Sequence, residues 1–254
     1  MLHALTHIVS PHLNECELTY RSRQPIDIGL ASEQHAAYCD TLRSFGLKVI
    51  ELERNRDYPD SVFIEDSAIV MDEIAVLTRH GVESRRGEVE AIGEELSNYR
   101  EIQRIQAPAT LEGGDVLIVG KKIFVGISSR TNDLGALALE KILAPFEYSI
   151  VRINVRGALH LKSAVTAIDE ATILANPKWF DTAPFANYRM ITVADAEPWA
   201  ANTLPVGGTI LMADGYPFTA EKVVKLGYKV KLLDIRELQK AEAGLTCSSI
   251  IFRE

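Results

Sequence analysis

The stretch Leu245–Phe252, LTCSSIIF, places the thiol of Cys247 at the start of an apolar run near the C-terminus. A cysteine in such a place either packs as a small hydrophobic side chain or attacks as a thiolate. Four other short apolar runs also begin with a polar residue, namely Asp66, Glu112, His160 and Asn202. The steps along this series are 46, 48, 42 and 45 residues, ending at the cysteine. A nearly constant step of this size indicates a repeat architecture.

Each repeat is predicted to contain two short strands, a helix and a closing strand. In the clearest unit, Glu112–Val119 and Ile123–Ile127 form the strand pair, Thr131 caps a helix, and Ile150–Ile153 is the closing strand. The other complete units are expected over residues 62–106, 160–193 and 202–233. In the unit over 160–193, Pro177 and Pro184 interrupt the helical pattern, so we expect a weak helix there.

The last unit has only one strand of its own, Cys247–Phe252. A strand at Leu5–Val9 can supply its partner, and a helix from Ser32 to Phe45 can supply the rest. The chain would then close into a ring with its N- and C-terminal strands side by side. We therefore predict an α/β fold, a five-bladed ββαβ propeller with pseudo-fivefold symmetry. The polar loop over residues 10–29 is long enough to be a functional lid.

Composition sets the class of protein. The chain has 254 residues, of which 47% are apolar, and it contains no linker rich in Pro, Gly or Ser, so we expect a single domain over residues 1–254. A net charge of −8 argues against nucleic-acid binding and suits a small cationic substrate, although many ordinary enzymes are also acidic. No apolar run approaches the roughly 20 residues that span a bilayer, so no membrane partner is expected.

The three cysteines, Cys16, Cys39 and Cys247, include no CxxC pair. An odd number of unpaired cysteines argues against a disulfide framework and against a structural zinc site. The first residues also lack the basic and apolar regions of a signal peptide. We therefore expect a reducing, cytoplasmic compartment.

The predicted ring would bring Asp66, Glu112, His160 and Cys247 together, with Asn202 in a structural role. A cysteine, a histidine and two carboxylates suit covalent catalysis, in which the thiolate attacks, the imidazole moves protons and a carboxylate orients the imidazole. Paired carboxylates also match the forked N–H donors of a guanidinium. Taken singly, the cysteine and the histidine are more often packing residues. Only one side chain of the neighbours Glu65 and Asp66 can face the centre if both lie on a strand.

Arg85 and Arg130 occupy matching places in two successive repeats, 45 residues apart, and each follows a serine. Two arginines at equivalent positions can clamp an α-carboxylate through bidentate hydrogen bonds. The alternative is a pair of solvated residues at the start of two helices.

Five motifs in order resemble the dimethylarginine dimethylaminohydrolase family of the guanidino-modifying, or pentein, superfamily. These motifs are DSVFIED at 60–66, ESRRGE at 83–88, LEGGD at 111–115, LHLKS at 159–163 and LTCSS at 245–249. The resemblance implies a five-bladed α/β propeller. It also implies hydrolysis of asymmetric dimethylarginine or monomethylarginine to citrulline and a methylamine, with no metal or cofactor.

The resemblance implies a role for each matching residue. Cys247 would attack the guanidinium carbon to form a covalent thiouronium, His160 would protonate the leaving amine and then activate water, and Glu112 would orient His160. Asp66 is carried over as both a catalytic and a substrate-binding residue. The substrate-binding set implied is Leu18 in the lid, Asp60, Phe63, Glu65, Asp66, Arg85, Arg130 and the carbonyl of Ala241.

Several alternatives stay open. Arginine deiminase and other members of the superfamily carry His-x-Asp, whereas Lys162 occupies the third position here, which leaves room for N-methyl groups. A binding protein of the same fold, such as translation initiation factor 6, lacks the cysteine, histidine and carboxylate set. A thiol hydrolase on a doubly wound sheet is the third alternative. The preferred substrate among methylated arginines, arginine and other alkylguanidines stays open, as does a homodimer.

Overall fold

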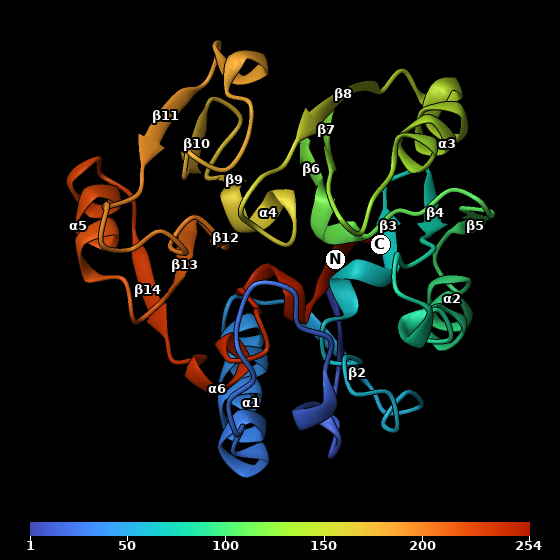
Figure 1. Cartoon of the computed structure of the whole chain (residues 1–254), viewed down its shortest axis with the longest axis horizontal. Helices are drawn as coiled ribbons and strands as arrows, with labels where there is room; N and C mark the ends of the chain where they lie inside the picture. Colours follow the sequence, from blue (N-terminus) through green and yellow to red (C-terminus); the bar gives the residue numbers. More distant parts are fainter.

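The structure is a computed structural model that describes residues 1–254. Its strands form five sheets of three strands each. In every sheet the first two strands are antiparallel, and the third is parallel to the second. Figure 1 shows the sheets following one another around the molecule. The α/β class and the ββαβ order of the repeat are therefore confirmed.

The bounds of the elements follow the repeat. The first sheet combines both ends of the chain: β15 (Ile250–Arg253), β1 (Leu2–His7), α1 (Ile28–Ser44) and β2 (Lys48–Leu52). The second contains β3 (Ala68–Val70), β4 (Ile74–Leu77), α2 (Val89–Leu96) and β5 (Glu101–Arg104). The third contains β6 (Val116–Val119), β7 (Lys122–Ile127), α3 (Asp133–Leu143) and β8 (Ser149–Asn154).

The last two sheets differ from each other in the helix they carry. The fourth contains β9 (Val165–Ala167), β10 (Thr172–Ala175) and β11 (Arg189–Thr192), with only the 3-10 turn η6 (Ala183–Phe185) in place of a long helix. The fifth contains β12 (Leu204–Val206), β13 (Thr209–Ala213), α5 (Pro217–Lys225) and β14 (Val230–Leu233). Short helical turns connect the sheets: η2 (Ile64–Ser67), η4 (Gly113–Asp115), α4 (Leu161–Ala164), α6 (Arg236–Gln239) and η7 (Thr246–Ser248). Three further turns lie within the first three units: η1 (Leu13–Glu15), η3 (Glu83–Arg85) and η5 (Ala144–Phe146).

The predicted pairing of the terminal strands is confirmed. β1 pairs antiparallel with β15, with Leu2 opposite Arg253 and Leu5 opposite Ile250. β1 also pairs in parallel with β2 through the α1 crossover. The first sheet thus joins segments from opposite ends of the sequence, and the N and C labels lie near the middle of Figure 1.

Apolar side chains are buried between consecutive sheets. One cluster joins the second sheet to the third, for example Val76 with Ile123, and similar clusters join the third to the fourth and the fourth to the fifth. A cluster containing Leu42 and Leu211 joins the fifth sheet to the first, and one containing Leu5 joins the first to the second. Each sheet therefore buries apolar residues against two neighbours. None of the helices combines the length and hydrophobicity that crossing a bilayer requires.

The strand starts were predicted wrongly in one respect. The unit over 62–106 was expected to open with a strand that contains Asp66, but Ile64–Ser67 is a 3-10 helix and β3 begins at Ala68. Helical turns likewise separate Glu112, His160 and Cys247 from the strands that follow them. On a helical turn two consecutive polar side chains can both be buried, as Glu65 and Asp66 are, whereas a strand would send them to opposite faces.

Two helix starts also differ from the prediction. α1 begins at Ile28 because the carboxylate of Asp27 accepts a hydrogen bond from the backbone N–H of Leu30, so Ser32 lies inside the helix. Asn132, not Thr131, caps α3 by accepting from Gly135 at 2.8 Å. Several adjacent residues can cap a helix, and the sequence does not distinguish among them. The weak helix predicted for the unit over 160–193 is confirmed, since this unit has only the 3-10 turn η6.

Candidate active site

Four helical turns, each just before an inner strand, position the predicted site residues. Asp66 lies within η2, Glu112 and His160 directly precede η4 and α4, and Cys247 lies within η7. The side-chain donor atoms of Asp66, Glu112 and His160 all lie within 4.8 Å of one another. The cysteine and His160 line the same cavity. The structure therefore brings together the four residues that the spacing singled out.

The imidazole of His160 is paired with Glu112. His160 Nε2 lies 2.7 Å from Glu112 Oε2, and the other carboxylate oxygen accepts from the backbone N–H of Gly81 at 3.0 Å. Burial opposes a charge on His160, but Asp66 and the hydrogen bond to Glu112 raise its pKa to about 9. An imidazolium at neutral pH can donate a proton to a leaving group.

Asp66 remains an anion although it is buried. Burial would raise its pKa, but the cationic His160 and Arg85 hold the pKa of this carboxyl below its usual value. Arg85 Nη1 donates to one oxygen at 2.8 Å, and the backbone N–H of Gly114 donates to the other at 3.0 Å. The negative charge of Asp66 is thus fixed next to the imidazole.

The thiol of Cys247 is half-buried and accepts a hydrogen bond from the backbone N–H of Gly244 at 3.3 Å. Burial, together with the carboxylates of Glu65 and Asp66, raises the pKa of the Cys247 thiol to about 12. The thiol is therefore protonated in this state. A cation placed among these carboxylates would offset their field and favour the thiolate.

The cavity next to the thiol has a volume of only about 20 Å³. It is lined by Glu17, Asp60, Phe63, Asp66, Arg85, Arg130, Leu159, His160, Ala241, Glu242, Ala243 and Cys247. This space holds about one water molecule. Access for an amino acid therefore requires a neighbouring segment to move.

Residues 17–21 belong to the loop that was predicted to be a lid, and two buried carboxylates hold them in place. The backbone N–H of Glu17 donates to both oxygens of Asp60 at 3.1 and 3.3 Å. The backbone N–H groups of Thr19, Tyr20 and Arg21 all donate to the carboxylate of Glu242. Burial raises the pKa of Asp60 to about 6. Glu242, at a left-handed φ of 62°, was not found from the sequence, because its partners lie more than 220 residues away.

The two predicted arginines differ in how many of their N–H groups already have hydrogen-bond acceptors. Arg85 donates to Asp66, Glu88 and the carbonyl of Phe63, so four of its five N–H groups have acceptors. Arg130 lies 3.6 Å from Glu112 Oε1 and 3.5 Å from the hydroxyl of Thr19. Both line the cavity, and Arg130 has more N–H groups free to bind an anion there.

Glu65 and Leu18 lie outside the lining of this cavity. Glu65 accepts from Lys162 at 2.5 Å and from the hydroxyl of Thr246 at 2.7 Å. Asp66 lines the cavity and Glu65 does not, as expected for one of the two neighbours, although both are buried and both lie on a helical turn rather than on a strand. Leu18 packs against the cluster between the fifth and first sheets.

Asn202 has the structural role that was expected. Its amide donates to the carbonyl of Lys162 and to the hydroxyl of Thr246, and its carbonyl oxygen accepts from the backbone N–H of Thr246. Asn202 thereby fixes the turn that carries Cys247. Asp115, another residue that the prediction left without a role, accepts from the backbone N–H of Leu161 at 2.8 Å and positions the turn after His160.

Asp66, Glu112 and His160 have the donor types of a metal site. However, the guanidinium groups of Arg85 and Arg130 lie 2.8 and 3.6 Å from these carboxylates. Two resident cations repel a third, so the set suits proton transfer beside a charge-balanced ion-pair network better than it suits a metal ion.

The fold and the site together define a thiol–imidazole centre surrounded by carboxylates, a class suited to a cationic substrate. A family model described as eukaryotic N,N dimethylarginine dimethylhydrolase matches residues 13–183. The chain is 38% identical to the N(G),N(G)-dimethylarginine dimethylaminohydrolase of Streptomyces coelicolor over 99% of this chain and 97% of that protein.

Two solved structures of such enzymes match nearly the whole chain. One, from Pseudomonas aeruginosa, is a Cys-to-Ser variant in complex with citrulline; it has a TM-score of 0.93 at 33% identity and covers 98% of each chain. The other is the adduct of a His-to-Gly variant with S-methyl-L-thiocitrulline, with a TM-score of 0.94 at 33% identity, over 98% of this chain and 99% of that one. The chain belongs to the dimethylarginine dimethylaminohydrolase family.

Proposed function

We propose that this chain hydrolyses asymmetric dimethylarginine and monomethylarginine to citrulline and a methylamine through a covalent thiouronium on Cys247. The observation that carries the proposal is the buried His160–Glu112 pair, 2.7 Å apart, lining one cavity with the thiol. Related enzymes that bind citrulline and form an adduct with a thiocitrulline support the same substrate class.

The first half of the reaction replaces the amine by sulfur. The bound guanidinium offsets the charges of the carboxylates, so the thiol of Cys247 releases its proton to solvent and its sulfur bonds to the guanidinium carbon. The bond from that carbon to the methylated nitrogen breaks, and His160 gives its proton to the departing amine. Glu112 keeps the imidazole oriented throughout.

The second half regenerates the enzyme. His160, now neutral, takes a proton from a water molecule, whose oxygen bonds to the same carbon. The carbon–sulfur bond then breaks, which releases citrulline and restores the cysteine. The pairing of His160 with two carboxylates allows it to act first as the acid and then as the base.

The substrate is held at both ends. We infer that Asp60 and Asp66 accept from the unmethylated guanidine nitrogens, and that Phe63 contacts the apolar part of the substrate. Arg130 binds the α-carboxylate, with the remaining N–H of Arg85 as a second donor. The carbonyl of Ala241, a residue that lines the cavity, accepts from the α-amino group.

Two predicted substrate residues lie outside the cavity lining. We propose that Leu18 contacts the substrate as part of the lid. Glu65 acts indirectly, because it binds Lys162 and Thr246, the residue before Cys247.

Lys162 supports a preference for methylated substrates over arginine. A lysine at this position offers no carboxylate to a second unmethylated nitrogen of the substrate. Its ammonium is instead bound to Glu65 at 2.5 Å. The arginine deiminase alternative, which rests on an aspartate at this position, is therefore less well supported.

We also propose that the five sheets form one closed, five-bladed propeller and a single catalytic domain over residues 1–254. Each sheet buries apolar residues against two others, including the fifth against the first, which supports closure. All three cysteines are free, in keeping with the predicted reducing cytoplasmic compartment. A homodimer stays a prediction.

A side-by-side assay tests the proposed function. Purified protein is given asymmetric dimethylarginine, monomethylarginine or arginine, and citrulline and the released amine are measured. We expect citrulline from the two methylated substrates and much less from arginine. Citrulline from arginine alone would support the deiminase alternative, and no citrulline from any of the three would contradict the proposal.

A further inference from the structure

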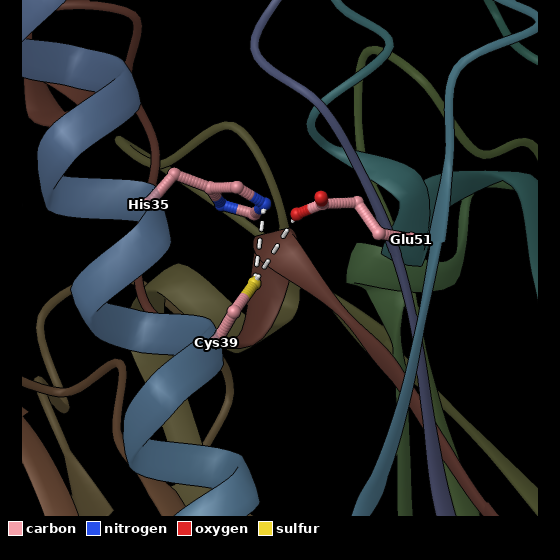
Figure 2. A group of neighbouring side chains, drawn as sticks. All are labelled: His35, Cys39 and Glu51. Atoms are coloured by element: carbon pink, nitrogen blue, oxygen red, sulfur yellow. Dashed lines mark hydrogen bonds between the residues drawn. The ribbon is translucent and has the colours of Figure 1, made fainter.

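A second cluster of cysteine, histidine and carboxylate lies away from the candidate active site. His35 and Cys39 are on α1, and Glu51 is on the neighbouring strand β2; Figure 2 shows these three side chains pointing toward one another. We call them the α1–β2 cluster. None of the three lines the cavity next to Cys247.

The local sequence explains why the helix contributes two donors. His35 and Cys39 are four residues apart, so their side chains lie on the same face of α1. β2 is an edge strand of the first sheet and runs beside β1. Glu51 reaches the two helical side chains from that strand, so the cluster joins the helix to the edge of the sheet.

The separations of the donor atoms resemble those of a zinc site. Cys39 Sγ lies 3.5 Å from His35 Nε2 and 3.9 Å from Glu51 Oε2, and the three donor atoms all lie within 4.8 Å of one another. Around tetrahedral zinc, the usual bond lengths place such ligand atoms about 3.4 to 3.6 Å apart. Small rotations of the Glu51 side chain would complete the match.

The environment of the cluster also suits a cation. His35 and Cys39 are buried, and the thiol of Cys39 is the one hydrogen-bond partner of Nε2 of His35, the nitrogen nearest the sulfur. Glu51 is exposed and forms no salt bridge, yet its carboxylate turns toward the sulfur. The nearest cationic side chain of α1, Arg43, is paired with Asp40. A carboxylate and a thiolate together would balance the two charges of Zn²⁺.

We propose that the α1–β2 cluster binds one Zn²⁺ through His35 Nε2, Cys39 Sγ and a carboxylate oxygen of Glu51, with water as the fourth ligand. The thiol gives up its proton when the Zn–S bond forms. This mixed set of nitrogen, sulfur and oxygen ligands is typical of zinc. The absence of CxxC pairs does not exclude such a site, because the fold brings its ligands together. The bound ion would link α1 to β2, because two of its ligands are on the helix and one is on the strand.

Metal titration tests this site separately from the candidate active site. The starting protein is Cys247→Ser, which removes the thiol of the candidate active site. Co²⁺, a spectroscopic substitute for Zn²⁺, is added, and the thiolate-to-metal charge-transfer band is recorded; Zn²⁺ affinity is measured by competition with a chromophoric chelator. We expect one ion bound per chain, with the charge-transfer band present.

Further variants in this background identify the ligands. Cys39→Ser should abolish the band, and Glu51→Gln should weaken Zn²⁺ binding by about 100-fold or more, beyond the 10–100-fold cost of losing an outer-sphere partner. Cys16→Ser, which removes another buried cysteine, should change neither. Because Glu51 is exposed, its variant is informative even if Cys39→Ser fails to fold.

Two results would overturn the proposal. One is the absence of the band in Cys247→Ser with Co²⁺ in excess. The other is Zn²⁺ affinity in the Glu51→Gln variant equal to that of its parent, because the carboxylate is then not a ligand.

Discussion

The chain contains two cysteine–histidine pairs, and they differ in the charge of the imidazole. Burial raises the pKa of both thiols, to about 12 for Cys247 and to about 11 for Cys39. The pKa of His160 is raised to about 9, whereas burial lowers the pKa of His35 to about 4. At neutral pH the first pair is a thiol beside an imidazolium, and the second is a thiol beside a neutral imidazole.

The neighbours of each ring explain the difference. Asp66, Glu112 and Asp115 all favour a positive charge on His160. Around His35 burial is the largest effect, and His7 and Arg43 lower its pKa further. A buried histidine beside a cysteine therefore carries a positive charge only where carboxylates surround it closely enough to offset the cost of burial. Substitutions at matching positions of the two pairs test this difference in the charge of the imidazole.

Replacing each cysteine should separate the two pairs most strongly. Cys247→Ser should reduce citrulline formation by at least about 10⁴-fold, because the nucleophile of the covalent step is lost. Cys39→Ser should retain turnover, since this thiol lies outside the cavity. Citrulline assays on both variants, with circular dichroism as a check on folding, make the comparison. Similar losses of citrulline formation in the two variants would contradict the assignment of the nucleophile to Cys247 alone.

The carboxylate partners give the next contrast. Glu112→Gln removes the charge that supports the His160 imidazolium, so kcat should fall by about 10² to 10⁴-fold, and the limb of the pH profile due to His160 should move to lower pH. Glu51→Gln, the matching change in the α1–β2 cluster, should leave the pH profile in place. The measurement is kcat as a function of pH for both variants. A profile for Glu112→Gln that coincides with the wild type would remove Glu112 from this role.

Arg130→Ala should mainly raise KM. It removes charged hydrogen bonds to the α-carboxylate, worth about 1.5–3 kcal/mol, so we expect a change of about tenfold to one hundredfold. The control is Arg43→Ala, which removes an arginine on the outer part of α1. Steady-state kinetics with dimethylarginine decide, and an unchanged KM for Arg130→Ala would move the carboxylate site elsewhere.

The smallest expected effects are on stability, and the two histidines should act in opposite pH windows. The raised pKa of His160 stabilises the folded state below the ordinary histidine pKa of 6.5, and this contribution is lost as the pH rises toward about 9. The lowered pKa of His35 costs stability as the pH falls from 6.5 toward about 4. Urea unfolding of the wild type, His160→Gln and His35→Gln across both pH ranges measures the contribution of each histidine to the free energy of unfolding. The same pH dependence in all three proteins would show that neither histidine contributes.

Much of the fold was predictable because the residues that carry chemistry recur at the same place in each repeat. The nearly constant steps along Asp66, Glu112, His160, Asn202 and Cys247 predicted five three-stranded sheets and the pairing of β1 with β15. The same spacing predicted that these side chains meet, since equivalent positions of successive units face one region.

What the sequence could not predict depends on contacts between distant segments. The lid is held by Glu242, whose partners at 19–21 are separated from it by almost the whole chain. The helical turns before the inner strands were missed because short apolar runs fit a strand or a turn equally well. The α1–β2 cluster was missed because only two of its three residues share a helical face.

The most direct test of the account is the mass of the His160→Gly protein after incubation with S-methyl-L-thiocitrulline. Its leaving group is a thiol, which departs without a proton from His160, whereas release of the adduct by water needs the imidazole. We expect a covalent adduct with the mass of the substrate less methanethiol, and none when Cys247→Ser is added. No adduct under saturating substrate, or an adduct that persists without the thiol of Cys247, would contradict the account.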